Sequence, residues 1–89
     1  MEKTKIEIIN KLGLHARAAA KFVQTTSAFN SEVVVRYNDK EVNGKSIMGI
    51  MMLAASKGNT IEIQAVGSDE KQAIEALVKL ISDRFDEKE

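Results

Sequence analysis

The sequence predicts an α+β fold, a two-layer, open-faced β-sandwich in which helices cover one face of a four-stranded antiparallel sheet. Two observations support this fold class. Segments that alternate apolar and polar residues are typical of strands with one buried and one wet face. Apolar stripes at helical spacing supply helices that can cover the buried face. In chain order these segments read βαββαβα.

The first strand and the first helix are predicted on either side of a glycine. Residues 5–9 are rich in β-forming residues and place Ile6 and Ile8 on one face. Gly13 then interrupts the pattern, and the Ala-rich residues 16–29 are expected to be helical. The positions at helical spacing are Ala16, Ala19, Ala20 and Val23.

A hairpin and a short helix are predicted next. Residues 32–37 and 41–43 are expected to pair around a turn signal at residues 38–39. Ser46 is expected to cap a short apolar helix over residues 47–55, because its side-chain oxygen can accept a free backbone N–H.

The last third of the chain has the clearest periodicity. Residues 60–66 alternate in the manner of a half-buried strand. Asp69, followed three residues later by Gln72, resembles a helix capping box. A final helix is predicted from an apolar stripe at Ile74, Leu77, Val78, Ile81 and Phe85.

Composition excludes several classes of protein. With 89 residues the chain is expected to be a single domain, residues 1–89. It has no cysteine and one histidine, so a disulfide, a thiolate metal site and a multi-histidine metal site are excluded. We expect neither a metal nor a cofactor. The start lacks the apolar core of a signal peptide, and no apolar run approaches the ~20 residues that span a bilayer. We therefore expect a monomeric cytoplasmic protein without membrane insertion.

Charge patterning indicates that any anion must be bound locally. The 13 basic and 13 acidic residues balance, which gives no long-range attraction to nucleic acid or anionic lipid. The predicted helix start at residue 16 is a local anion site, because its first backbone N–H groups are free and the helix dipole is positive there. The N–H groups of Ala16 and Arg17 are the candidates.

His15 and Arg17 carry the strongest chemical signal. His15 lies at that helix start and can present a ring nitrogen as a nucleophile to a phosphoryl group. The planar guanidinium of Arg17 can bind phosphate oxygens, and Gly13 allows close backbone approach. Taken alone, however, a His-x-Arg pattern more often marks a solvated loop histidine and a surface arginine, since the motif is so short.

A resemblance to a known family over several longer segments favours the functional interpretation of His15 and Arg17. Residues 13–17 (GLHAR) and 19–23 (AAKFV) resemble the active-site signature of the HPr family, the histidine-containing phosphocarriers of the phosphoenolpyruvate-dependent phosphotransferase system. Residues 44–51 (GKSIMGIM) resemble that family's regulatory-serine region, and residues 54–67 resemble its last strand with the preceding turn. The blocks follow the family's order and spacing over essentially the whole chain.

The resemblance implies a phosphocarrier without turnover of its own. Enzyme I would phosphorylate His15, Arg17 would stabilise the phosphate, and sugar-specific A components would accept the phosphoryl group in bacterial sugar transport. It further implies regulatory phosphorylation of Ser46, with an HPr serine kinase/phosphorylase and a transcriptional regulator as additional partners. Neither a nucleic acid nor a cofactor is implied.

The methionine-rich helix is predicted to dock these partners. A helix this short cannot bury every face, and flexible thioethers suit a surface that fits several proteins. In the family the corresponding helix lies beside the active histidine. Carried over to this chain, the partner-binding residues are Ala20, Gln24, Ser27, Ile47, Met48, Met51 and Met52.

Two departures from the family pattern bear on the rate of transfer. The family usually has proline after the arginine, where this chain has Ala18, and often a small polar residue before the glycine, where this chain has Leu12.

Two alternative functions stay open. One is a nitrogen-branch or regulatory relative that signals through His15 or Ser46. The other is a small RNA-binding module, which shares the βαββαβ order but needs strand aromatics and a basic face.

Overall fold

The computed structural model describes residues 1–89 and confirms the α+β class and the βαββαβα order. Its strands are β1 (Glu2–Glu7), β2 (Glu32–Tyr37), β3 (Lys40–Asn43) and β4 (Thr60–Val66). Its helices are α1 (Ala16–Ser27), α2 (Ile47–Met52) and α3 (Glu70–Ser82), and a short 3₁₀ turn follows at Arg84–Asp86.

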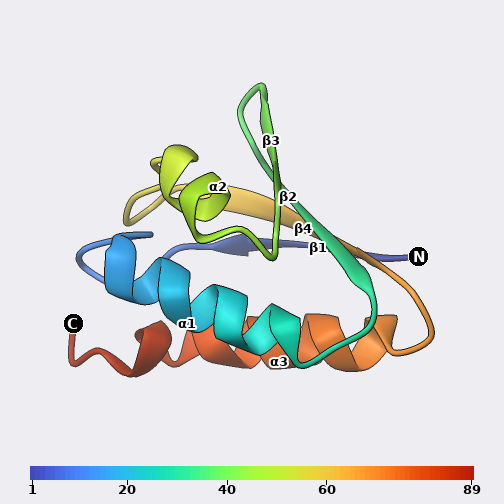
Figure 1. Cartoon of the computed structure of the whole chain (residues 1–89). Coiled ribbons are helices and arrows are strands. Elements are labelled where there is room, and N and C mark those ends of the chain that lie inside the picture. The colour runs from blue at the N-terminus through green and yellow to red at the C-terminus, as the bar shows by residue number, and fades with distance from the viewer.

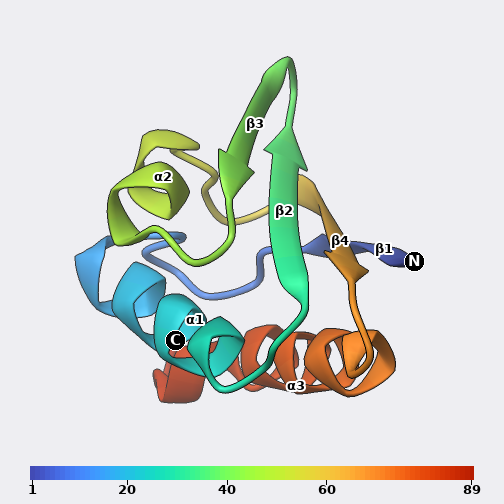
Figure 2. The same cartoon turned by 45° about the vertical axis from the view of Figure 1, so that its right-hand side comes forward.

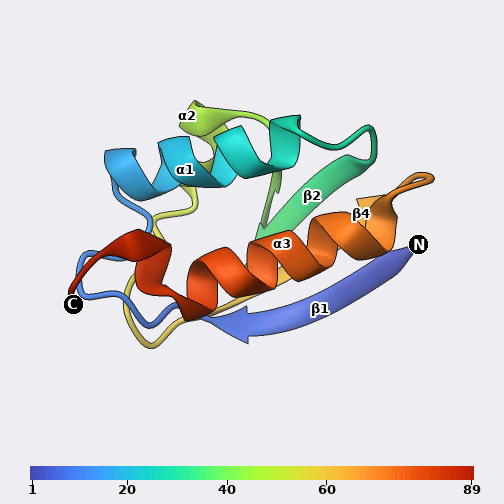
Figure 3. The same ribbon diagram turned by 90° about the horizontal axis from the view of Figure 1, so that it is seen from below.

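The four strands form one antiparallel sheet in the order β1-β4-β2-β3. Helices α1 and α3 both lie against one face of this sheet (Figure 1). Seen from below, they run side by side in opposite directions (Figure 3). The hairpin of β2 and β3 rises away from these two helices, and α2 contacts both α1 and β3 (Figure 2). The start of α1 and the end of the chain therefore lie at the same edge of the molecule.

The core lies between the sheet and the two long helices. The alternation predicted for β4 is confirmed, because Ile61, Ile63 and Ala65 are fully buried and Glu62 and Gln64 are not. Burial of a large aliphatic or aromatic side chain stabilises a fold by about 1.5–3 kcal/mol. The largest fully buried apolar side chains are Phe22, Phe85, Ile8, Ile50, Leu53, Ile61, Ile63, Leu77, Ile81 and Val35.

Strand β1 begins and ends earlier than predicted, at Glu2–Glu7 in place of residues 5–9. Its pairing with β4 extends from Glu7↔Thr60 to Glu2↔Ala65. Charged residues do not prevent this pairing, because β1 is an edge strand whose polar side chains can remain in water. Strand β3 also begins one residue earlier than predicted, at Lys40.

Helix α1 buries only part of the set at helical spacing: Ala19 is buried and Val23 is partly buried. Ala16 and Ala20 are exposed, and the helix ends at Ser27 rather than at residue 29. Alanine is equally compatible with either side of a helix, so the alanine spacing was ambiguous. Phe22 determines the face, because it is the largest side chain that must be buried. The buried residues are Ala18, Ala19, Phe22 and Thr26.

Two helix boundaries differ from the prediction for local reasons. Helix α2 ends at Met52 and not at residue 55, since Ala54 has a left-handed φ of 55° that breaks the helix. The predicted capping box is wrong. Asp69 makes no side-chain cap hydrogen bond, and its carboxylate instead accepts hydrogen bonds from the backbone N–H groups of Asn30 and Ser31 and from the Ser31 hydroxyl.

Gly13 fixes the loop that leads into α1. Its φ is +66°, and a Cβ there would lie 2.7 Å from the carbonyl oxygen of Ala55. We expect Gly13→Ala to destabilise the fold by well over the ~1–2 kcal/mol that a left-handed φ alone costs. Gly58→Ala is the matched control, because its φ is +92° but no atom lies within 4 Å of the added Cβ. Urea unfolding of both variants measures the difference, and equal losses would contradict the close packing at Gly13.

Candidate functional site

His15 is the residue at which α1 begins. Its backbone is extended, with φ −73° and ψ 177°, and its carbonyl accepts the first helical hydrogen bond from Ala19 at 2.8 Å. The preceding Leu14 is buried, and its N–H donates to the Ala55 carbonyl at 3.0 Å. The backbone at His15 is therefore held on both sides, while the imidazole stays partly exposed.

The N-terminus of α1 is free to bind an anion. The imidazole makes no capping hydrogen bond, and the backbone N–H groups of Ala16 and Arg17 have no partner within the chain. No acidic residue lies in the first turn. Arg17 is exposed and makes no ion pair, so its guanidinium is available. The residues predicted to hold a phosphate are thus adjacent and unoccupied by other protein groups.

The end of the chain turns back across this helix start. Arg84, Phe85 and Asp86 all have left-handed backbones, with φ of 57°, 54° and 62°. Phe85 is fully buried although it lies beyond the end of α3, where the predicted stripe had placed it within the helix. Lys21 of α1 holds this turn, because its Nζ donates to the Phe85 carbonyl at 2.6 Å.

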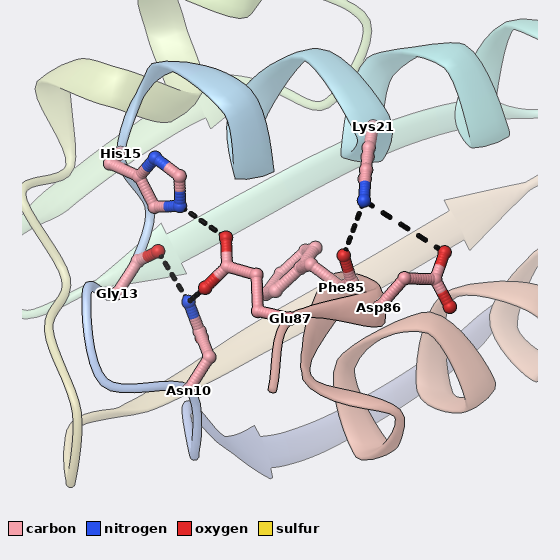
Figure 4. Close-up of polar contacts among 7 residues, drawn as sticks. All are labelled: Asn10, Gly13, His15, Lys21, Phe85, Asp86 and Glu87. Atoms are coloured by element: carbon pink, nitrogen blue, oxygen red, sulfur yellow. Dashed lines mark hydrogen bonds and ion pairs between the residues drawn. The ribbon is translucent and has the colours of Figure 1, made fainter. Parts of the chain in front are cut away.

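This turn delivers a carboxylate to the histidine. Oε2 of Glu87 contacts Nε2 of His15, and Oε1 accepts a hydrogen bond from Nδ2 of Asn10 at 3.0 Å (Figure 4). Burial raises the pKa of the Glu87 carboxyl, but the hydrogen bonds from His15 and Asn10 outweigh that effect and leave the pKa below its ordinary value. Glu87 is therefore ionised at neutral pH and acts as an acceptor.

A shallow hollow lies in front of the imidazole. It brings residues before and after the helix start together with the end of the chain. Cations and carboxylates are mixed in this lining, so the hollow has no strong field of one sign. Its lining residues are Lys11, Leu12, His15, Ala16, Arg17, Glu87, Lys88 and Glu89.

The predicted docking residues lie on α1 and α2, and Ser46 directly precedes α2. Ser46 caps α2 as predicted, since its Oγ accepts the Gly49 N–H at 3.0 Å. The four large apolar side chains of α2 that were predicted to dock partners are exposed, by 43% for Ile47, 67% for Met48, 38% for Met51 and 66% for Met52. The α1 residues of the same prediction are also exposed: Ala20, Gln24 and Ser27.

Sequence reasoning missed two residues of the site, Asn10 and Glu87. Glu87 lies 72 residues from the histidine that it contacts, so no local spacing could link them. Asn10 lies only five positions before His15, but nothing in its neighbourhood separates it from an ordinary turn asparagine. Both become visible only when the chain end is seen to return to α1 (Figure 4).

No helix of the structure has the length and apolar character that crossing a membrane requires.

Comparison with known proteins finds the family model "PTS HPr component phosphorylation site" over residues 2–83. Phosphocarrier protein HPr of Neisseria meningitidis is 62% identical over 89 residues, covering all of both chains. The protein of the same name from Pseudomonas putida is 53% identical over 90 residues, again covering all of both chains.

Solved structures agree with these sequence matches. The crystal structure of HPr-C-His from Thermoanaerobacter tengcongensis has a TM-score of 0.96 and 54% identity, and all of both chains is covered. HPr from Bacillus anthracis has a TM-score of 0.86 and 41% identity, over 90% of this chain and 95% of the other.

The stability that the contact between Glu87 and His15 contributes is expected to fall in acid. Because the folded-state pKa of Glu87 is lowered, its contribution to stability is complete above the ordinary glutamate pKa of about 4.3. That contribution disappears as the pH falls through the lower folded-state pKa. Unfolding free energies of wild type and Glu87→Gln should therefore converge as the solution is acidified. Curves that stay parallel throughout would contradict an ionised, hydrogen-bonded Glu87.

Proposed function

The chain belongs to the HPr family, and we propose that it accepts a phosphoryl group from enzyme I on His15 and passes that group to sugar-specific A components. One observation supports this most directly. The only histidine of the chain lies at an open helix N-terminus, beside an arginine without a partner. Such a position suits the binding of a phosphoryl group and its transfer to a ring nitrogen.

The proposed nucleophile is Nδ1 of His15. Nε2 is occupied by Glu87, and Nδ1 points away from that contact toward the first turn of α1 (Figure 4). A lone pair on Nδ1 attacks the phosphorus, the bond from phosphorus to the donor breaks, and the donor keeps that electron pair. Transfer to an A component reverses these roles, with His15 as the leaving group. The protein ends each cycle unchanged and needs a partner at both steps.

Arg17 and the helix end would hold the phosphoryl oxygens. The free N–H groups of Ala16 and Arg17 can donate to an oxyanion, and the dipole of α1 adds partial positive charge. The Arg17 guanidinium is exposed and can bind two oxygens at once. Since the net charge of the whole chain is zero, this local set must do most of the stabilisation.

Partners would dock on the apolar surface of α2 and the neighbouring side of α1. The exposed methionines of α2 offer adaptable apolar contact, which suits a carrier that must fit one donor and several acceptors in turn. A nitrogen-branch relative would use the same residues, so the acceptor has to be identified by transfer to an isolated A component. Family membership argues against the RNA-binding alternative.

Ser46 is proposed as a regulatory phosphorylation site. Its Oγ caps α2, and the side chain stands immediately before the docking residues of that helix. A phosphate there would meet the free N–H groups of a helix start, which the fold can accommodate. The added charge would act instead on any partner that buries its surface against α2.

His15 is expected to become phosphorylated when the protein is incubated with phosphoenolpyruvate and enzyme I. Intact mass should show one acid-labile phosphate, absent in His15→Ala. Arg17→Ala should slow transfer by roughly 10- to 100-fold, as expected for losing charge-assisted hydrogen bonds worth ~1.5–3 kcal/mol. Its stability should change by less than about 0.5 kcal/mol.

Lys5→Ala is the control for Arg17→Ala, because it removes an exposed cation from β1, away from the helix start. Its transfer rate should equal that of wild type. Labelling that persists in His15→Ala, or an Arg17→Ala variant that is destabilised but transfers normally, would contradict the proposed roles.

A negative charge at position 46 is expected to weaken docking to enzyme I without unfolding the domain. For Ser46→Asp, the enzyme I concentration at half-maximal rate should rise roughly fivefold, equivalent to ~1 kcal/mol of lost docking energy. Ser46→Ala separates charge from capping, since it loses the cap, worth about 1 kcal/mol of stability, but adds no charge. The rate of His15 phosphorylation is measured against enzyme I concentration for both variants, and circular dichroism checks that each variant is folded. Equal titration curves for Ser46→Asp and wild type would leave Ser46 as a helix cap only.

A further inference from the structure

We propose that Glu87 is a positioning residue for phosphoryl transfer, and that Asn10 and Glu87 together hold the His15 ring with its hydrogen on Nε2 and its lone pair on Nδ1. The inference rests on the proposed function of His15. It adds to that function a carboxylate from the far end of the chain, which acts through the His15 ring. The geometry of the three side chains carries it (Figure 4).

The contact between Glu87 and His15 defines which ring nitrogen bears the hydrogen. An ionised carboxylate can only accept hydrogen bonds, so Nε2 must donate to it. In a neutral imidazole the other nitrogen then carries the lone pair. That nitrogen, Nδ1, faces the first turn of α1, where the free N–H groups lie (Figure 4).

Asn10 fixes the carboxylate in turn. Its Nδ2 donates both to the Gly13 carbonyl, at 2.8 Å, and to Oε1 of Glu87, at 3.0 Å. Its Oδ1 is buried without any hydrogen-bond partner. Leaving a buried acceptor unsatisfied is costly. The reversed amide would bring its oxygen against two other acceptors, so the amide of Asn10 has one allowed orientation.

The backbone that carries Glu87 is costly and well anchored. Arg84, Phe85 and Asp86 adopt left-handed conformations in succession, each unfavourable for a residue with a Cβ. The buried ring of Phe85 and the bond from Lys21 to its carbonyl hold them there. Strained non-glycine backbone persists where the surrounding structure over-determines it, and is concentrated at functional sites. Here the strained turn aims one side chain at His15.

The arrangement fits the charge changes of the reaction. As the bond from Nδ1 to phosphorus forms, the ring gains positive charge, which it shares with Nε2–H. The adjacent Glu87 carboxylate stabilises that charge without moving a proton. When the phosphoryl group leaves, the bond from nitrogen to phosphorus breaks, and the ring keeps the electron pair as a neutral imidazole. The hydrogen on Nε2 stays in place throughout, so no proton donor is required.

Glu87→Gln provides the sharpest test, because Asn10 determines how the new amide is oriented. The glutamine Oε1 should take the hydrogen bond from Asn10, which leaves its NH₂ group facing Nε2 of His15. That group donates, so it favours the ring with the lone pair on Nε2 and the hydrogen on Nδ1. Glu87→Gln should therefore be worse than Glu87→Ala, which removes the contact without favouring the wrong tautomer.

Two measurements test this expectation, one of the His15 tautomer and one of the transfer rate. Long-range ¹H–¹⁵N spectra of the protein with labelled histidine identify the protonated ring nitrogen. We expect hydrogen on Nε2 in wild type and on Nδ1 in Glu87→Gln. Steady-state transfer from enzyme I should show a maximal rate that is lower in Glu87→Gln by roughly 10- to 100-fold, the range seen when the partner that orients a metal-bound histidine is lost. The enzyme I concentration at half-maximal rate should be unchanged, because the proposed docking residues lie on α2 and on the neighbouring side of α1.

Two further variants separate positioning from a merely structural role. Asn10→Ala combined with Glu87→Gln frees the glutamine amide to rotate, so its rate should recover toward that of Glu87→Ala. Asp86→Asn neutralises the neighbouring tail carboxylate, which does not contact His15, and asparagine tolerates its left-handed backbone. Its rate and spectrum should equal those of wild type.

Hydrogen on Nδ1 in the wild-type spectrum would overturn the proposal, and that measurement needs no variant to fold. Glu87→Gln that transfers at the wild-type rate would also overturn it, while leaving the proposed function intact. A wild type that accepts no phosphate from enzyme I would instead contradict the proposed function, whatever tautomer the spectrum shows.

Discussion

The packing of two antiparallel helices on one face of the sheet sets the position of the groups around His15. The outer face of β1, β4 and β2 carries mostly polar side chains, whereas α1 and α3 share the apolar face. The two helices lie there side by side in opposite directions (Figure 3). The positive end of α1 therefore adjoins the end of α3, where the chain continues to Glu87. Histidine, free backbone N–H groups and tail carboxylate meet at one edge for that reason.

A site assembled at an edge suits a carrier protein. The imidazole lies in a shallow hollow rather than a deep pocket, so a partner's phosphorylated group can reach it directly. Rigid backbone supports it from beneath through Gly13, Leu14 and Ala55. The exposed apolar residues of α2, on which we propose docking, are distinct from the residues that line this hollow. Ser46 stands at the beginning of that surface.

Local patterns predicted much of this arrangement, and long-range contacts account for the remainder. Strict alternation predicted β4 to the residue, and the side-chain chemistry of Ser46 predicted its cap. The alanines of α1 could not show which face is buried, because alanine fits both. The left-handed turn at Phe85 has no glycine to signal it. Glu87 reaches His15 only through that turn, so its role was invisible in the sequence.

The most direct test of the account is to locate the bond to phosphorus. The protein, with ¹⁵N-labelled histidine, is phosphorylated by phosphoenolpyruvate and enzyme I, and the coupling between ³¹P and each ring nitrogen is measured. Because Nε2 of His15 is occupied by Glu87, we expect one-bond coupling to Nδ1. Phosphate on Nε2, or no phosphate bonded to the histidine, would contradict it.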